Sequence, residues 1–133
     1  MKKIELLDDG HCFVCGKSNQ SGLKLVFRKD GDKVVSEFVP QKYHQGFKDI
    51  VHGGIISAVL DEAMVKAVLF LGIEAVTAEI TVRLKNPLFV GDKAFIEAEI
   101  KTMGTRLIET YSLIRKEDNT LIAESSAKLL RNA

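Results

Sequence analysis

The feature that most constrains the fold is one long apolar segment, residues 53–71, in a chain whose other patterned segments are β-rich. The segment contains no proline, is dense in alanine, leucine, methionine and valine, and is followed by Gly72, a residue type that commonly ends a helix. It predicts one helix of roughly 28 Å. Asp61, Glu62 and Lys66 near its middle would be costly inside a bilayer, so we expect a core helix and no membrane span.

Two β-rich segments precede this helix and four follow it. An Asp30-Gly31 pair, a strong hairpin signal, joins the first two, and short turns separate the last three. This order predicts a single α+β domain over residues 1–133, with one antiparallel sheet, one central helix and an irregular N-terminal segment at 1–22. The expected strands cover residues 23–28, 33–39, 76–85, 93–103, 106–116 and 120–130.

The charge balance of the chain limits its partners. It carries 19 basic and 18 acidic side chains, for a net charge of +1. This balance argues against a general nucleic-acid or membrane-surface binder, because such affinity depends on a basic excess. The N-terminus has two lysines but no apolar stretch behind them, so we expect no secretory signal and a cytoplasmic location.

Cys12 and Cys15, with His11 in front of them, are the only two cysteines. One such pair is half of a zinc site, and no second Cys/His pair with ligand spacing follows it. His44 or His52 could complete a site in space. We favour the alternative in which reduced thiols pack an N-terminal turn, and we expect neither a metal nor a cofactor.

Asp61 falls on the apolar face of the expected helix. With Ser57 at zero and about 100° per residue, Glu62 and Lys66 fall near 140° and 180°, which predicts a solvated edge, whereas Asp61 falls near 40°, beside Val68. A carboxylate in apolar surroundings is costly unless it is paired, hydrogen-bonded or protonated. Asp61 is therefore either a structural residue bonded to the Ser57 hydroxyl or a backbone N–H, or a general base or nucleophile.

The segment 44–62 resembles the HGG…D signature of hotdog-fold thioesterases, with His52-Gly53-Gly54 at the helix start and Asp61 nine residues after the histidine. It is similar specifically to the phenylacetic-acid-degradation branch of the 4-hydroxybenzoyl-CoA thioesterase superfamily. The runs 77–87 and 90–92 continue the resemblance, which covers roughly residues 20–130. It implies a hotdog fold, a curved antiparallel sheet of about six strands wrapped around one long helix.

The resemblance also implies an activity, the hydrolysis of an acyl-coenzyme A to free acid and coenzyme A. Asp61 would activate a water or attack the carbonyl itself, and the Gly53 N–H at the positive end of the helix would stabilise the oxyanion. Gly54 would shape the same turn, and Thr77 stands where relatives carry a hydroxyl that orients the water or the carboxylate. In this family the groups come from two subunits, which implies a homodimer or homotetramer.

His52 and Gln45 each allow two interpretations. His52 is either a general base or a residue whose imidazole holds the loop through backbone groups, and we favour the second because aspartate is the more usual reactive group in this family. Many relatives carry an asparagine six residues before the histidine. Gly46 occupies that position here, and Gln45 is the nearest amide that could replace it.

Arg83, Lys85 and Arg106 are the candidates for binding coenzyme A phosphates. Arg83 and Lys85 alternate on one face of their strand, and Arg106 lies just after the Gly104 turn. Simple solvation of strand-end cations is the alternative. Acyl-CoA is the expected partner, with no nucleic acid and no membrane. A hotdog-fold hydratase or dehydratase and a non-catalytic acyl-CoA sensor stay open as other functions.

Overall fold

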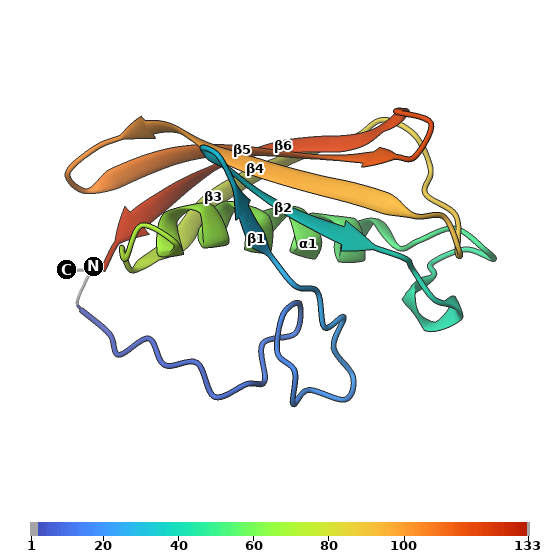
Figure 1. Cartoon of the computed structure of the whole chain (residues 1–133), viewed down its shortest axis with the longest axis horizontal. Coiled ribbons are helices and arrows are strands. Elements are labelled where there is room, and N and C mark those ends of the chain that lie inside the picture. The colour runs from blue at the N-terminus through green and yellow to red at the C-terminus, as the bar shows by residue number, and fades with distance from the viewer. Residues whose placement is uncertain (1–2, 133) are drawn as a thin grey trace.

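The computed structural model describes residues 3–132 as one six-stranded antiparallel sheet with one α-helix along it (Figure 1). Residues 1, 2 and 133 of the predicted domain lie outside this range. The strand order is β1-β2-β4-β5-β6-β3, and every neighbouring pair is antiparallel. This arrangement confirms the predicted architecture. The elements are β1 (Arg28–Asp30), β2 (Lys33–Phe38), the 3-10 helix η1 (Lys42–His44), α1 (Gly53–Leu69), β3 (Ala75–Leu84), β4 (Ala94–Met103), β5 (Leu107–Lys116) and β6 (Leu121–Arg131).

The helix α1 ends two residues earlier than predicted, at Leu69. Phe70 is its C-cap, and Gly72 has a φ of 77°, a left-handed conformation that glycine adopts without strain. α1 packs against five of the six strands, β2 to β6. Its buried side chains recur every three or four residues and form the core with the inward side chains of the sheet. They are Ile56, Val59, Leu60, Ala63, Met64, Ala67 and Val68.

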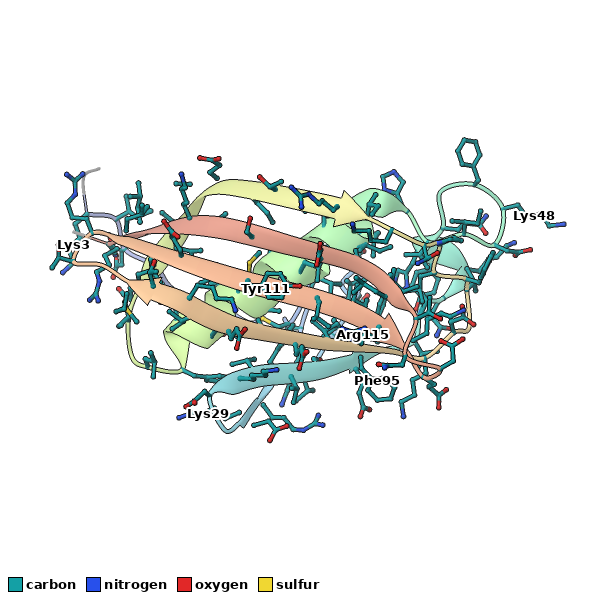
Figure 2. The ribbon with its side chains drawn as sticks, turned by 90° about the horizontal axis from the view of Figure 1, so that it is seen from above. Lys3, Lys29, Lys48, Phe95, Tyr111 and Arg115 are labelled. Carbon is teal, nitrogen blue, oxygen red and sulfur yellow. The ribbon has the colours of Figure 1, made fainter. Side chains whose placement is uncertain are left out.

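The sheet face away from α1 is polar. Figure 2 shows Tyr111 and Arg115 on this face. The Tyr111 hydroxyl donates to Oε2 of Glu124 at 2.8 Å, and the ammonium group of Lys101 lies 5.3 Å from the centre of the Tyr111 ring. Inward and outward side chains therefore alternate as expected for a sheet with one covered face.

The first strand is shorter than predicted, because residues 23–27 do not pair with β2. Leu23 and Leu25 donate backbone hydrogen bonds to Phe13 and Val14 of the N-terminal segment, at 2.8 and 2.9 Å. Lys24 between them has a φ of 55°, which interrupts an extended strand. The predicted hairpin between the first two strands is present, with Gly31 at a φ of 62°.

The N-terminal segment passes along the side of α1 that faces away from the sheet (Figure 1). Its contact with α1 makes one sequence prediction wrong. Glu62 and Lys66 were expected on a solvated edge, but their side chains are only 19% and 18% exposed. A helical wheel shows which residues share a face and cannot show that a distant segment covers that face.

The strand β3 forms one edge of the sheet and is ten residues long. Ile80 and Leu84 on this strand are 38% and 56% exposed. Such an edge offers backbone groups for pairing with another chain. Within the described part of the chain, no helix is long and apolar enough to cross a membrane.

Candidate active site

Asp61 on α1 and Thr77 on β3 meet between the helix and the sheet. The Thr77 hydroxyl donates a hydrogen bond to Oδ1 of Asp61 at 2.7 Å, and both residues are half-buried. The Ser57 hydroxyl instead donates to the carbonyl of Gly53 at 2.9 Å. The structural bond between Asp61 and Ser57, which the sequence left open, is therefore not formed.

A β-bulge aims Thr77 at the helix. The register between β3 and β6 shifts between Thr77 and Glu79, so that Ala78 has no partner residue on β6. After the bulge, Glu79 faces outward, with its carboxylate 3.9 Å from the ammonium of Lys128. Without the shift, Thr77 and Glu79 would share one face, because side chains alternate along a strand.

The helix start is capped by His52. Its Nδ1 accepts a hydrogen bond from the N–H of Gly54 at 2.8 Å, which satisfies one of the free donors of the first turn. A Cβ on Gly54 would lie 2.9 Å from the same Nδ1, so glycine allows this close approach. The contact agrees with the loop-holding interpretation of His52.

The N–H of Gly53 is the free donor at this helix start. The amides of Gly54, Ile55 and Ile56 all bond to His52, whereas the Gly53 amide has no acceptor within residues 3–132. A cavity of about 620 Å³ opens beside it and is mostly apolar, a size and character typical of small-molecule sites. Its walls include His52, Gly53, Ile56, Leu84, Lys85 and Leu88.

Gln45 lies at the base of the loop before the helix. Its Oε1 accepts the backbone N–H of Asp49 at 2.9 Å, and Asp49 has a φ of 65°. Gly46 donates to the carbonyl of Ile50 at 2.8 Å across the same loop. The oxygen of the Gln45 amide therefore holds the loop, and contact of this amide with a thioester stays a prediction.

The structure separates the three candidate phosphate-binding cations. Lys85 lines the cavity and lies 3.9 Å from a carboxylate oxygen of Glu124, while Arg83 is exposed on the same strand. Arg106 lies at the other end of the molecule, where its carbonyl accepts the N–H of Arg131. Within one chain, Arg106 does not join the other two.

Two contacts were not predicted from the sequence. On the sheet side of α1, the Ser112 hydroxyl donates to the carbonyl of Leu60 at 3.1 Å and lies 2.7 Å from the Ser125 hydroxyl, which ties the turn before Asp61 to β5 and β6. On the opposite side of α1, the thiols of Cys12 and Cys15 contact Glu62. Ser112 and Ser125 occupy inward positions of their strands, and a buried hydroxyl needs a hydrogen-bond partner, so the sequence offered a signal for the contact with the Leu60 carbonyl.

His44 and His52, named from the sequence as possible metal ligands, are engaged elsewhere. His44 is buried at the end of η1, and its ring packs edge-on against the ring of Tyr43, with 4.5 Å between the ring centres. Its Nδ1 accepts a hydrogen bond from the backbone N–H of Gln41. Burial lowers the pKa of His44 below its usual 6.5, which favours the neutral imidazole. His52 caps the helix instead.

Sequence comparisons relate this chain to known thioesterases. The profile of the Thioesterase superfamily matches residues 48–123. The acyl-coenzyme A thioesterase THEM4 of Xenopus laevis is 26% identical over 105 residues, which cover 79% of this chain and 47% of that protein. The human acyl-coenzyme A thioesterase THEM5 is 26% identical over 130 residues, covering 93% and 53%. This chain therefore spans about half the length of the curated relatives it matches.

Solved structures show the same fold. A hypothetical thioesterase protein of Streptococcus pneumoniae, solved with coenzyme A, has a TM-score of 0.76 at 17% identity, covering 80% of this chain and 84% of that one. The same protein was solved with an aspartate and, separately, a threonine replaced by alanine, at positions 16 apart. The PaaI protein of Escherichia coli, from the phenylacetic acid degradation operon, has a TM-score of 0.77 at 21% identity, covering 82% and 84%.

These likenesses confirm the hotdog fold, with its six-stranded antiparallel sheet and single helix. The family profile covers more than half of the chain and includes the helix start, Asp61 and Thr77. The chain belongs to the Thioesterase superfamily.

Proposed function

We propose that this protein is an acyl-CoA thioesterase that hydrolyses an acyl-coenzyme A to free acid and coenzyme A, and that it belongs to the phenylacetic-acid-degradation branch of its superfamily. The observation that carries this proposal is the 2.7 Å hydrogen bond from Thr77 to Asp61 on the inner face of a hotdog helix. The two residues are 16 positions apart, the same separation as the aspartate and threonine replaced in the pneumococcal protein.

Asp61 is the proposed reactive group. Thr77 holds Oδ1, and Oδ2 makes no hydrogen bond within residues 3–132, so Oδ2 is free to act. As a general base, it takes a proton from a water whose oxygen attacks the thioester carbonyl carbon. Collapse of the tetrahedral intermediate breaks the C–S bond and expels the coenzyme A thiolate, which takes up a proton. As a nucleophile, Oδ2 would attack the carbonyl and form an anhydride that water then hydrolyses.

The Gly53 N–H is the proposed oxyanion donor. It is the amide of the first turn that no group in the described chain accepts, and it lies at the positive end of the helix dipole beside the apolar cavity. An oxyanion at this point would gain a hydrogen bond beside a mostly apolar cavity wall. Such donors stabilise the transition state more than the ground state.

The two halves of the proposed site come from two subunits in our proposal. Gly53 and Asp61 are eight residues apart on one helix, or about 12 Å along its axis, whereas reacting atoms approach to about 3–3.5 Å. One chain therefore cannot bring both groups to one carbonyl. We propose a homodimer in which the edge strand β3, with its exposed Ile80 and Leu84, lies at the interface. Arg106 would then reach coenzyme A phosphates bound by Arg83 and Lys85 only from the partner.

A hydrolysis assay with purified protein tests the function. Short-chain, long-chain and aromatic acyl-CoAs are each incubated with the protein, and the free acid and coenzyme A are quantified by chromatography, because thiol reagents would also react with Cys12 and Cys15. We expect equal amounts of acid and coenzyme A from at least one class. Binding of acyl-CoA by calorimetry without any acid formed would instead identify a sensor, and a hydrated acyl-CoA product would identify a hydratase.

A further inference from the structure

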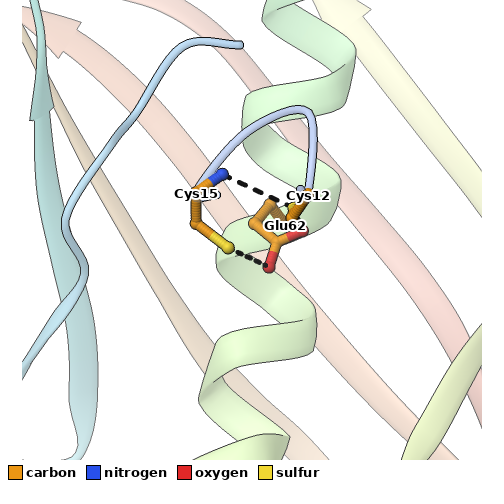
Figure 3. A group of neighbouring side chains, drawn as sticks. All are labelled: Cys12, Cys15 and Glu62. Carbon is orange, nitrogen blue, oxygen red and sulfur yellow. Dashed lines mark hydrogen bonds between the residues drawn. The ribbon is translucent and has the colours of Figure 1, made fainter. Parts of the chain in front are cut away.

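A turn of the N-terminal segment presents two thiols to one carboxylate of α1 (Figure 3). The Sγ of Cys12 lies 3.5 Å from Oε2 of Glu62, and the Sγ of Cys15 lies 3.6 Å from Oε1. One ligand atom from each residue can be chosen so that all three lie within 4.8 Å of one another. All three residues are half-buried. Nothing in the thioesterase site uses them.

The backbone holds this turn in one shape. The N–H of Cys15 points at the Sγ of Cys12 at 3.5 Å, and the N–H of Gly16 donates to the carbonyl of Cys12 at 2.9 Å. A Cβ on Gly16 would lie 2.4 Å from the backbone nitrogen of Cys12, so the turn requires glycine. Val14, between the cysteines, is buried and accepts a backbone hydrogen bond from Leu25. The backbone that carries the two sulfurs is therefore held in one shape by the chain itself.

The spacing of these atoms suits a tetrahedral cation. Zinc binds thiolate sulfur at about 2.3 Å and carboxylate oxygen at about 2.0 Å, which places a sulfur and an oxygen about 3.5 Å apart at the tetrahedral angle. The measured separations between the sulfurs of Cys12 and Cys15 and the oxygens of Glu62 are 3.5 and 3.6 Å. A small rotation of the carboxylate would bring one of its oxygens to both sulfurs.

Charge also balances at this site. Two thiols and one carboxylate carry a charge of −1, which the ammonium of Lys66, 3.9 Å from Glu62, opposes. Replacing the two thiol protons by one divalent cation leaves that charge unchanged.

We propose that Cys12, Cys15 and Glu62 form a binding site for one divalent cation that favours thiolate ligands, with Zn²⁺ as the expected ion. On binding, both S–H bonds break, two protons leave to solvent, two sulfur–metal bonds and one oxygen–metal bond form, and a water completes the tetrahedron. The ion would fasten the N-terminal segment to α1. The sequence predicted no metal because no second Cys/His pair follows Cys12 and Cys15, and the structure places Glu62 beside them as a third candidate ligand.

Metal binding by the whole chain tests the proposal. The protein is reduced, stripped with a chelator, supplied with Zn²⁺ in slight excess and desalted, and its metal content is measured by mass spectrometry. We expect about one zinc per chain, and Co²⁺ in its place should give sulfur-to-cobalt charge-transfer absorption. Zinc should also protect both thiols of the wild-type protein from alkylation, a measurement that needs no variant.

Variants then identify the ligands. The double variant Cys12→Ser/Cys15→Ser should retain no zinc, and Glu62→Gln should weaken binding at least tenfold. Glu97→Gln is the matched control, because Glu97 also contacts one lysine, Lys33, at 3.4 Å but lies on β4, and it should bind zinc as the wild type does. No retained zinc with unprotected thiols in the wild type would overturn the proposal. Unchanged affinity in a folded Glu62→Gln variant would also overturn it, because the site would then lack its third ligand.

Discussion

The hydroxyl of Thr77 lies 2.7 Å from Oδ1 of Asp61, and it is a β-bulge in the strand of Thr77 that turns this hydroxyl toward the helix. The bond restrains the carboxylate to one orientation while it leaves the second oxygen free. A carboxylate fixed in this way loses little conformational freedom when a substrate arrives.

Replacement of Asp61 by asparagine should remove most hydrolysis without unfolding the protein. Asparagine keeps the shape of the side chain and can still accept the Thr77 hydrogen bond at its oxygen, but it cannot take a proton or form an anhydride. We expect kcat to fall by about 10²- to 10⁴-fold. The variant Asp30→Asn, on the exposed strand β1, is the control. Near-normal turnover by a folded Asp61→Asn protein would remove Asp61 from the mechanism.

Two variants of Thr77 should distinguish the contribution of its hydroxyl to kcat from the contribution of its side-chain shape. Thr77→Val keeps a β-branched side chain but removes the donor, whereas Thr77→Ser keeps the donor. A hydrogen bond to a charged group contributes about 1.5–3 kcal/mol, so we expect Thr77→Val to lower kcat roughly ten- to a hundredfold and Thr77→Ser to retain most activity. Near-normal activity of Thr77→Val together with a loss in Thr77→Ser would show that the methyl group matters and the hydroxyl does not.

Mixing two inactive variants should restore activity if the site spans two subunits. Asp61→Asn lacks the reactive group, and Gly53→Val adds bulk beside Leu84 at the oxyanion donor. A mixed dimer contains one intact pair, from Gly53 of one chain and Asp61 of the other. After subunit exchange at equal amounts, we expect about a quarter of wild-type activity. Demonstrated exchange with no recovery would place both groups in one subunit.

His52 should stabilise the protein by capping the start of α1 and should not act as the general base. Loss of an N-cap side chain costs about 0.5–2 kcal/mol, so His52→Ala should lower the free energy of unfolding by that amount, while His52→Asn should restore much of it. Urea unfolding measures both variants. If His52 only caps the helix, His52→Asn also keeps kcat near the wild-type value. A stable His52→Asn protein with kcat reduced a hundredfold or more would instead make His52 a general base.

The buried His44 should make the protein less stable in mild acid. Burial lowers its pKa below 6.5 in the folded state, so below about pH 6.5 the unfolded chain binds a proton that the folded chain does not. The stability gained above pH 6.5 is therefore lost as the pH falls toward the folded pKa of His44, by at most about 1.4 kcal/mol per pH unit. His44→Gln should flatten the unfolding free energy between pH 7 and 5. An identical pH dependence in this variant would contradict the prediction.

Most of the fold could be predicted because its signals are local. The periodicity and composition of α1, the Asp30-Gly31 hairpin and the turn at Gly104 each depend on neighbouring residues. The predicted first strand is too long because Leu23 and Leu25 bond to a turn about ten residues earlier. The local sequence pattern does not show whether this segment pairs with β2 or with the N-terminal turn.

The candidate site was predicted less completely for the same reason. Asp61, Gly53 and His52 follow from the helix wheel and the resemblance. The burial of Glu62 depends on a contact with Cys12, fifty residues earlier, which no short window of sequence contains. The hydrogen bond from the Asp49 amide to the Gln45 oxygen depends on the particular conformation of the loop. Arg106 was grouped with Arg83 and Lys85 by residue type, although the sheet register places it at the opposite end.

The unpaired Ala78 makes strand length, as well as residue identity, a determinant of this site. Deleting Ala78 would leave the side chains of Thr77 and its neighbours chemically unchanged. It would nevertheless either rotate the Thr77 hydroxyl away from the helix or shift the rest of β3 by one position along β6. Insertions and deletions at this point should therefore be far less tolerated than most exchanges of one side chain for another. A library built only from substitutions would sample the chemistry of the pocket and miss the spacing that assembles it.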